Sequence, residues 1–136
     1  MNGSDDSSRR RLVAGIGCTS NATGDEVLAL VRSALAQARG RPIALGTIAR
    51  RDGHAALIAV ATALGLPLRI IDLPGPEVAE PVAASAGAIV LEKRKSAHAT
   101  CALAAVPAGF DPDSWGQPSS SAAIASGTVA TSTAGP

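Results

Sequence analysis

The chain has 136 residues and a net charge of +1, and 46% of its residues are hydrophobic. This length allows one domain of ordinary size with a core. The near-neutral charge and the scarcity of aromatic residues exclude the basic and base-stacking surfaces of nucleic-acid-binding proteins. The two aromatic residues, Phe110 and Trp115, lie outside the patterned region, so we predict a core of Ala, Val, Leu and Ile.

The cysteines and the hydropathy of the sequence argue against metal binding, secretion and membrane insertion. Cys18 and Cys101 are the only cysteines, and no Cys/His spacing typical of a metal site is present. We therefore predict neither a metal nor a cofactor. The polar N-terminus lacks the apolar segment of a signal peptide, and no apolar run has the length of a membrane span. The sequence predicts a cytoplasmic protein with no nucleic-acid and no membrane partner.

The stretch VAGIGCTSNATGDE contains the first predicted strand and the start of a helix. Its β-branched residues predict a buried strand over 12–16, and Thr23 and Glu26 form a capping box that begins the helix. Gly15 and Gly17 would let the backbone turn sharply, and the helix N-terminus would favour an anion. A plain structural turn is an equal alternative, because the third glycine of a dinucleotide-binding loop is missing.

Further helices alternate with strands along the chain. The first helix is expected to run to about Arg39 and to be closed by Gly40, and Asp52 would cap a second helix ending at Gly65. The other expected elements are strands within 43–48 and over 68–71, a short helix over 77–86, and strands over 88–91 and 100–106. This order predicts an α/β fold: a three-layer α/β/α sandwich with a mixed, mostly parallel sheet of about five strands.

Composition divides the chain into three segments. Residues 1–10 are polar and are expected to be disordered. Residues 11–106 carry the hydrophobic pattern and are expected to form the domain. Residues 107–136 are rich in Ser, Ala, Gly, Pro and Thr without periodicity, so we predict a disordered low-complexity tail.

The connection EKRKSAHA, residues 92–99, is expected to be a hairpin loop with three consecutive cations. The polar residues here and at the start of the next strand are Lys93, Arg94, Lys95, Ser96, His98 and Thr100. Cations beside hydroxyl groups suit a small ligand with carboxylates or phosphates, whereas a solvated loop is the commoner outcome for a short charge run. If this loop and the glycine turn meet at one edge of the sheet, they would form a common pocket for an anion.

Other residues could take part in chemistry near these loops. Cys18 follows the glycine turn and is either a nucleophile or, more commonly, a packed thiol. His54 is either an acid or base or an exposed first-turn residue, and Glu80 either pairs with a cation or faces solvent. The catalytic candidates are His54 and Cys18. The candidate ligand-binding residues are Gly15, Gly17, Cys18, Thr19, Ser20, Arg51, Glu80, Lys93, Arg94, Lys95, Ser96 and Thr100.

Four stretches of the sequence together carry a family pattern. They are VAGIGCTSNATGDEV (Val13 to Val27), TIARRDGHAALIAVATALGLPLRIID (Thr47 to Asp72), VAE (Val78 to Glu80) and LEKRKSAHATCALA (Leu91 to Ala104). They resemble the CobE family of cobalamin biosynthesis and the C-terminal domain of CbiG, the cobalt-precorrin-5A hydrolase. The chain departs from that family at Arg51 and His54. It also has a shorter stretch from Leu73 to Glu77, which would remove part of one wall of a cleft.

The resemblance implies an α/β/α fold and a role in building the corrin ring. The implied ligand is a corrinoid or precorrin intermediate, which bears acetate and propionate groups, and the implied protein partners are other cobalamin-biosynthesis enzymes. The protein would then be a carrier or accessory factor. Two alternatives stay open. One is a precorrin lactone hydrolase that releases acetaldehyde, and the other is a generic phosphate- or nucleotide-binding module.

Overall fold

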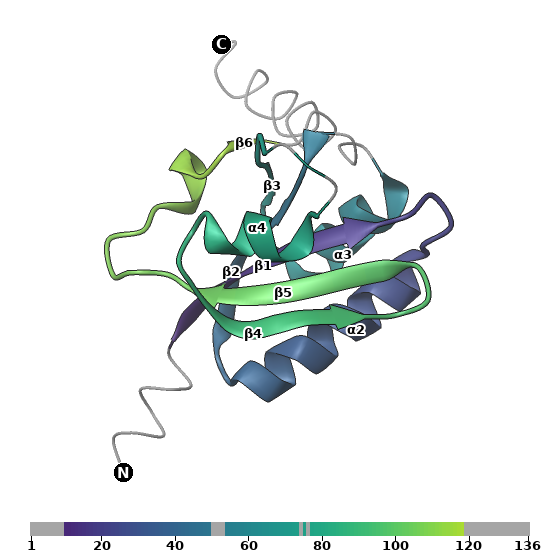
Figure 1. The fold of residues 1–136 in the computed structure, drawn as a ribbon, viewed down its shortest axis with the longest axis horizontal. Coiled ribbons are helices and arrows are strands. Elements are labelled where there is room, and N and C mark those ends of the chain that lie inside the picture. The colour runs from purple at the N-terminus through teal and green to yellow at the C-terminus, as the bar shows by residue number, and fades with distance from the viewer. Residues whose placement is uncertain (1–9, 50–53, 74, 76, 119–136) are drawn as a thin grey trace, which may run out of the picture.

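The computed structural model describes residues 10–49, 54–73, 75 and 77–118. Its elements are β1 (Arg11–Cys18), α2 (Gly24–Ala38), β2 (Arg41–Thr47), α3 (Ala55–Leu64), β3 (Leu68–Ile70), α4 (Ala79–Ala84), β4 (Ala88–Lys95), β5 (Ala99–Ala105), the 3-10 turn η2 (Pro112–Ser114) and β6 (Gln117–Pro118). Six strands form one sheet in the order β4-β5-β1-β2-β3-β6 (Figure 1). The predicted α/β class is confirmed. No helix in the described ranges is long and apolar enough to cross a membrane.

The sheet is mixed, as expected. β1 pairs in parallel with β2, and β2 pairs in parallel with β3. The other pairings, β1 with β5, β4 with β5 and β3 with β6, are antiparallel. Parallel pairing is therefore confined to β1, β2 and β3, because the β4–β5 hairpin and the late strand β6 complete the two sides of the sheet.

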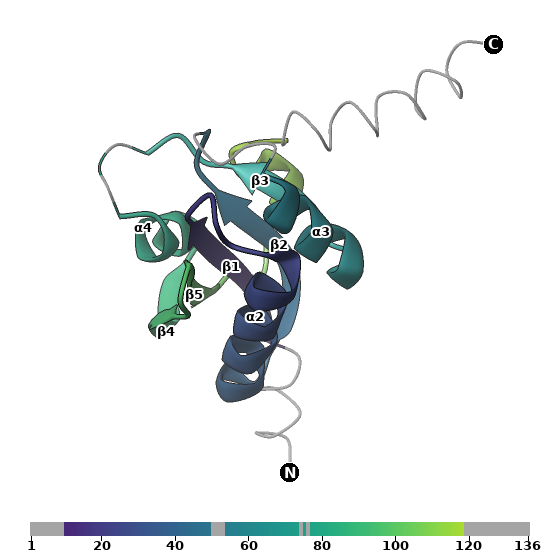
Figure 2. The same cartoon turned by 90° about the vertical axis from the view of Figure 1, so that its right-hand side faces the viewer.

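Helices cover both faces of the sheet (Figure 2). α2 and α3 pack against the face to which Leu12, Ala14 and Ile16 of β1 contribute. α4 covers the opposite face, where Val13 lies in a second buried cluster. Successive side chains of a strand point to opposite faces, so β1 supplies both cores. The predicted three-layer sandwich is present, and the single short helix α4 makes one layer thinner than the other.

Helix α2 starts where the capping pattern predicts and ends one residue early. The Thr23 hydroxyl accepts the Glu26 N–H at 3.2 Å, which confirms the expected N-terminus. The C-terminal cap is Arg39, with a φ of 56°, and the assignment of that role to Gly40 was wrong. Gly40 is required for packing instead, because a Cβ at this position would collide with the side chain of Leu12.

His54 is the N-cap of helix α3. Its Nδ1 accepts the Ala56 N–H at 3.1 Å, and its Nε2 donates to the Thr19 carbonyl at 2.9 Å. Both ring nitrogens therefore hold the β1–α2 turn against α3. The expected cap, Asp52, lies outside the described residues. The predicted end of the helix at Gly65, with a φ of 66°, is confirmed.

The β4–β5 hairpin has longer strands and a shorter loop than the sequence pattern predicts. β4 continues to Lys95 and β5 begins at Ala99, which leaves only residues 96–98 between them. Lys93 and Arg94 therefore lie in a strand and not in a loop. The alternation of a strand separates neighbouring side chains onto opposite faces, so the three cations do not form one group.

Residues 107–118 fold against the sheet, so the prediction of disorder is wrong for this part of the tail. Trp115 is 6% exposed and belongs to the same buried cluster as Val82 of α4. Its indole N–H donates to the Ser85 hydroxyl at 2.8 Å. The core is consequently not purely aliphatic. Residues 1–9 and 119–136 lie outside the described residues. Of the predicted N-terminal segment 1–10, only Arg10 is described, and its side chain donates to the Ala38 carbonyl at 2.7 Å.

Two arginines anchor this C-terminal segment. Arg69 is only 7% exposed. Its side chain donates to the main-chain carbonyls of Trp115 at 2.8 Å and Asp113 at 2.7 Å. Arg11 of β1 donates to the Phe110 carbonyl at 2.9 Å. Buried main-chain carbonyls need donors, and the guanidinium groups provide them. No residue-type pattern marks such contacts in the sequence, because the acceptors are main-chain atoms.

Candidate functional site

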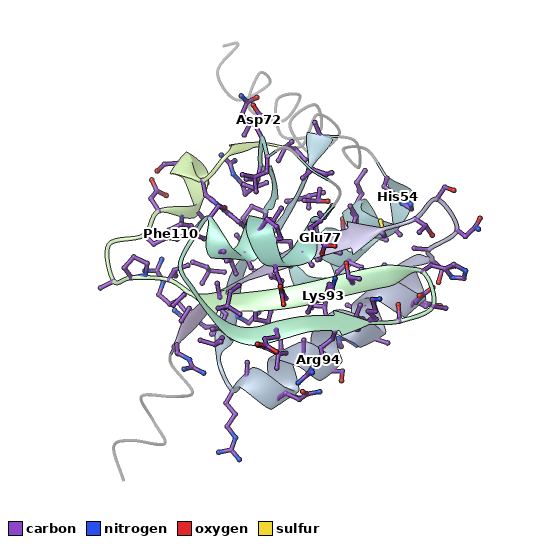
Figure 3. All side chains as sticks on the ribbon, viewed as in Figure 1. His54, Asp72, Glu77, Lys93, Arg94 and Phe110 are labelled. Carbon is purple, nitrogen blue, oxygen red and sulfur yellow. The ribbon has the colours of Figure 1, made fainter. Side chains whose placement is uncertain are left out.

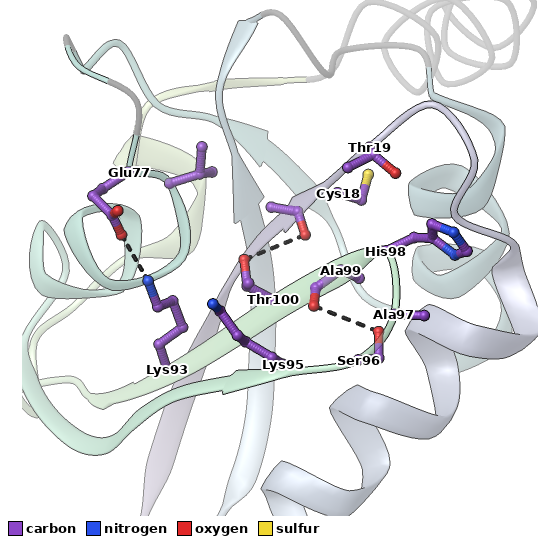
Figure 4. Close-up of a pocket in the computed structure, with 12 residues that line it drawn as sticks. Cys18, Thr19, Glu77, Lys93, Lys95, Ser96, Ala97, His98, Ala99 and Thr100 are labelled. Atoms are coloured by element: carbon purple, nitrogen blue, oxygen red, sulfur yellow. Dashed lines mark hydrogen bonds and ion pairs between the residues drawn. The ribbon is translucent and has the colours of Figure 1, made fainter.

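A pocket of about 490 Å³ lies where β1 ends and the β4–β5 hairpin turns (Figure 4). Its walls are formed by the end of β1 with Thr19, which we call the β1 turn, by the β4–β5 hairpin and by the residues just before α4. The lining residues are Gly17, Cys18, Thr19, Glu77, Val78, Lys93, Lys95, Ser96, Ala97, His98, Ala99 and Thr100. The end of the first strand and the cationic segment therefore meet at one edge of the sheet, as expected. The predicted sharp turn at Gly15 and Gly17 was wrong, because both glycines are paired residues of β1 and the chain turns only after Cys18.

Strand pairing brings these distant segments together. In the antiparallel β1–β5 ladder, Gly17 pairs with Thr100. Beyond the end of the ladder, the Thr19 N–H donates to the His98 carbonyl at 2.9 Å. The β1 turn is thus fixed to the hairpin loop by main-chain hydrogen bonds, which hold one wall of the pocket in place.

Lys93 and Lys95 line the pocket, whereas Arg94 lies on the other face of β4. The Lys93 ammonium forms an ion pair with the Glu77 carboxylate, with an Nζ–Oε1 distance of 2.9 Å. Arg94 lies beside α2 (Figure 3), and its guanidinium donates to Gln37 Oε1 of that helix at 3.1 Å. Lys95 makes no side-chain hydrogen bond or ion pair within the described part of the chain. Lys95 is therefore the cation of the pocket that remains available to a ligand.

The ion pair keeps Glu77 and Lys93 charged. The hydrogen bond from Lys93 lowers the pKa of Glu77, and the same contact raises the pKa of Lys93. The side chains are 62% and 29% exposed for Glu77 and Lys93 respectively, so water screens the pair and its contribution to stability is small. Among the charged side chains of the lining, the ammonium groups of Lys93 and Lys95 outnumber the Glu77 carboxylate, and the Glu80 carboxylate outside the lining also acts on Lys93.

Glu26, in the first turn of α2, clamps the hairpin loop. Its carboxylate accepts the Ser96 hydroxyl and, at 2.6 Å, the His98 N–H. The other carboxylate oxygen lies 3.0 Å from His98 Nδ1. The protein's own carboxylate is thus placed near the helix N-terminus, where an external anion was expected, and the pocket lining includes no residue of α2.

The clamp predicts a specific loss of stability in acid. Hydrogen bonds from Ser96 and from the His98 N–H lower the pKa of Glu26 below its ordinary value of 4.5. The folded pKa lies below the unfolded one, so the clamp stabilises fully above about pH 4.5 and is lost as the pH falls through the folded value. We expect the wild type to lose more unfolding free energy than Glu26→Gln between pH 5 and pH 3, measured by urea denaturation. Equal losses in both proteins would contradict the clamp.

Several candidate residues lie outside the pocket. Gly15 lies beneath α4, where a Cβ would overlap the Ala79 carbonyl oxygen, so its role is close packing of the helix on β1. Glu80 accepts the main-chain N–H of Lys93 at 2.8 Å, and Ser20 is an exposed turn residue. Arg51 lies outside the described residues.

The two cysteines occupy different environments. Cys18 lines the pocket and is 6% exposed. Cys101 is fully buried in the core, as predicted, and burial raises the pKa of its thiol to about 12. In the described ranges, no group of three His, Cys, Asp or Glu side chains could hold a metal ion.

The candidate ligand-binding residues omit five residues of the pocket, although three of them, Ala97, His98 and Ala99, lie in the hairpin segment that was expected to contribute. Glu77 and Val78 enter because the chain before α4 passes beside β4, which is a tertiary contact without a local signal. Assigning Lys93, Arg94 and Lys95 to a strand would have predicted that the two lysines share one face and that Arg94 points to the other, because side chains alternate along a strand. The omitted residues are Glu77, Val78, Ala97, His98 and Ala99.

Comparison with known proteins gives one family and one fold. Residues 12–74 match the family model described as "Cobalamin synthesis G C-terminus". CobE, a protein from the cobalamin (vitamin B12) biosynthetic pathway, has a similar structure: the TM-score is 0.60 and the identity 22%, over 72% of this chain and 92% of that chain. Cobalamin biosynthesis protein chiG from Agrobacterium tumefaciens has a TM-score of 0.60 and an identity of 28%, over 70% of this chain and 98% of that one.

A third similar structure is part of a longer chain. A protein described as a cobalamin biosynthesis protein G homologue from Sulfolobus solfataricus has a TM-score of 0.58 and an identity of 18%, over 72% of this chain and 37% of that one. No curated protein sequence matches. The comparisons therefore agree on the fold, which is shared by separate chains and by a segment of a larger protein.

Proposed function

Because this chain belongs to the family of CobE and the CbiG C-terminal domain, and is a cobalamin biosynthesis protein of that type, we propose that it binds a corrinoid or precorrin intermediate through the intermediate's carboxylates. It would act in the cytoplasm as a carrier or accessory factor that passes the intermediate to other enzymes of corrin-ring synthesis. The observation that carries this proposal is the position of Lys95, a cation that faces the pocket and has no ion-pair partner in the described residues.

Charge supports an anionic ligand. Lys93 and Lys95 outnumber Glu77 in the pocket lining, and a carboxylate close to an ammonium group forms a charge-assisted hydrogen bond. Corrin precursors carry acetate and propionate arms around the ring. An arm that enters the pocket would place its carboxylate beside Lys95, with the hydroxyl groups of Thr19 and Thr100 nearby in the lining.

Size and lining support a ligand that enters only in part. A volume of about 490 Å³ falls in the usual range of small-molecule pockets. Val78, Ala97 and Ala99 give the lining an apolar part that suits the methyl and methylene groups of the ring periphery. We infer that the pocket receives the edge of the macrocycle and its arms, and that the remainder of the ring faces solvent.

Binding is better supported than hydrolysis. A general base must reach the substrate, and both ring nitrogens of His54 are used in capping α3 and holding Thr19. The other catalytic candidate, Cys18, lines the pocket with only 6% of its surface exposed, so a hydrolase would have to use this thiol without His54 as its base. Release of acetaldehyde from a precorrin lactone by the purified protein would overturn this preference in favour of the hydrolase alternative.

A matched pair of pigments tests the proposal. Cobyrinic acid carries free carboxylates on the corrin ring, whereas cobinamide carries amides at those arms. Titration should change the visible spectrum of cobyrinic acid saturably, with at least a tenfold weaker effect of cobinamide, and added salt should weaken binding. Absence of a change with both pigments, or equal affinity for them, would contradict carboxylate recognition. ATP as a competitor would detect the nucleotide-binding alternative.

A further inference from the structure

The ion pair between Lys93 and Glu77 lies within the pocket lining. Glu77 belongs to the chain just before α4, and Lys93 belongs to β4, so the pair bridges two elements across the rim (Figure 4). The pair shares the pocket with Lys95, whose positive charge also acts on Glu77. Two ammonium groups therefore lie near Glu77, the carboxylate that contacts Lys93 directly, while the Glu80 carboxylate outside the lining also attracts Lys93.

We propose that Glu77 is an internal competitor for the ligand: its carboxylate holds Lys93 until a ligand carboxylate replaces it. This inference rests on the proposed function, because it assumes that the pocket takes carboxylates. It assigns a substrate class to the pocket, namely molecules with two neighbouring carboxylates, one for Lys95 and one for Lys93. A ligand with one carboxylate would pair with Lys95 and leave the ion pair intact.

The contacts of Lys93 allow such an exchange without a change of fold. Its main-chain N–H donates to the Glu80 carboxylate at 2.8 Å, so the backbone is held independently of the side chain. Its ammonium contacts only the exposed carboxylate of Glu77 among the described residues. A screened pair of this kind is weak, so a ligand carboxylate that is already positioned by Lys95 can replace Glu77 at small cost.

Neutralising Glu77 tests the competition. Glu77→Gln should bind cobyrinic acid about 3- to 5-fold more tightly than the wild type, because an exposed ion pair of ordinary strength no longer competes. Glu92→Gln is the control with the same change of charge, since Glu92 is an exposed residue of β4, next to Lys93, and lies outside the pocket lining. Its affinity should stay within twofold of the wild type. Cobinamide, with amides in place of the carboxylates, should show no gain with either variant.

A second measurement follows the displaced carboxylate. In the protein alone the pKa of Glu77 is lowered by Lys93. Displacement removes that partner and brings ligand carboxylates close, so the pKa of Glu77 should rise when cobyrinic acid is bound, as followed by the carbon-13 resonance of its carboxyl group.

The outcomes separate this inference from the proposed function. If the wild type binds cobyrinic acid and Glu77→Gln binds it equally or less tightly, Glu77 is not a competitor, and carboxylate binding stands. An unchanged or lowered pKa of Glu77 on binding would lead to the same conclusion. If neither protein binds cobyrinic acid, the proposed function itself fails and the inference fails with it.

Discussion

Replacing Lys95 with glutamate is expected to lower the affinity for cobyrinic acid about 100-fold. Lys95 lines the pocket, and its ammonium has no ion-pair partner in the described residues, so it is the group best placed to receive a ligand carboxylate. The substitution removes that attraction and sets two like charges against each other, a juxtaposition that costs several kcal/mol. Spectroscopic titration at fixed ionic strength measures the change.

The neighbouring residue provides a control with the same change of charge. Arg94→Glu introduces a carboxylate one residue away in β4, but on the face that contacts Gln37 of α2. Its effect on affinity should stay within about threefold, because a charge outside the pocket acts through screening solvent. Equal losses for the two variants would show that only the overall charge of the hairpin matters, and would contradict a specific role of Lys95.

Replacing Trp115 with alanine is expected to lower the unfolding free energy by about 3–5 kcal/mol, the usual cost of removing a large buried aromatic side chain. Trp115 is 6% exposed, and its ring packs so closely on β2 that a Cβ at Gly46 would overlap it. The substitution also leaves the Ser85 hydroxyl without the indole donor. Since Trp115 is the only tryptophan, unfolding is best followed by circular dichroism in urea.

A conservative variant separates packing from hydrogen bonding. Trp115→Phe keeps most of the ring contact and loses the N–H donor to Ser85, so its loss should be well below that of the alanine variant. Losses below about 1 kcal/mol for Trp115→Ala would contradict the conclusion that residues 107–118 are part of the core.

The order of elements and the fold class could be predicted from the sequence. Hydrophobic patterns located β1, β2, β3, α2 and α3, because apolar spacing reflects which side chains each element must bury, and the turn residues that flank it indicated α4. Local chemistry located the Thr23 and Gly65 caps, since a capping hydroxyl and a left-handed glycine act within a few residues of sequence. The family pattern was equally visible, and the match over residues 12–74 confirms it.

The C-terminal segment was mispredicted because its order comes from distant partners. Composition alone indicates that residues 107–118 cannot bury enough surface to fold. Trp115 nevertheless finds a space over Gly46 that the sheet and α4 create together. Arg69 then supplies donors to main-chain carbonyls that have no signature in the sequence. Composition measures what a segment can bury by itself, and this segment is ordered by surface that the rest of the chain provides.

By itself, the sequence determined the α/β class, the succession of strands and helices as far as β5, and the presence of cations and hydroxyl groups in segments near a glycine-containing strand, because these follow from local spacing and residue type. Only the tertiary structure decided which of those groups share a pocket. Antiparallel pairing of β5 with β1 brings Thr100 beside Gly17, strand alternation sends Arg94 away from Lys95, and Glu77 enters from a segment before α4. Such choices depend on register and on contacts between distant segments, and neither is encoded in any short stretch of residues.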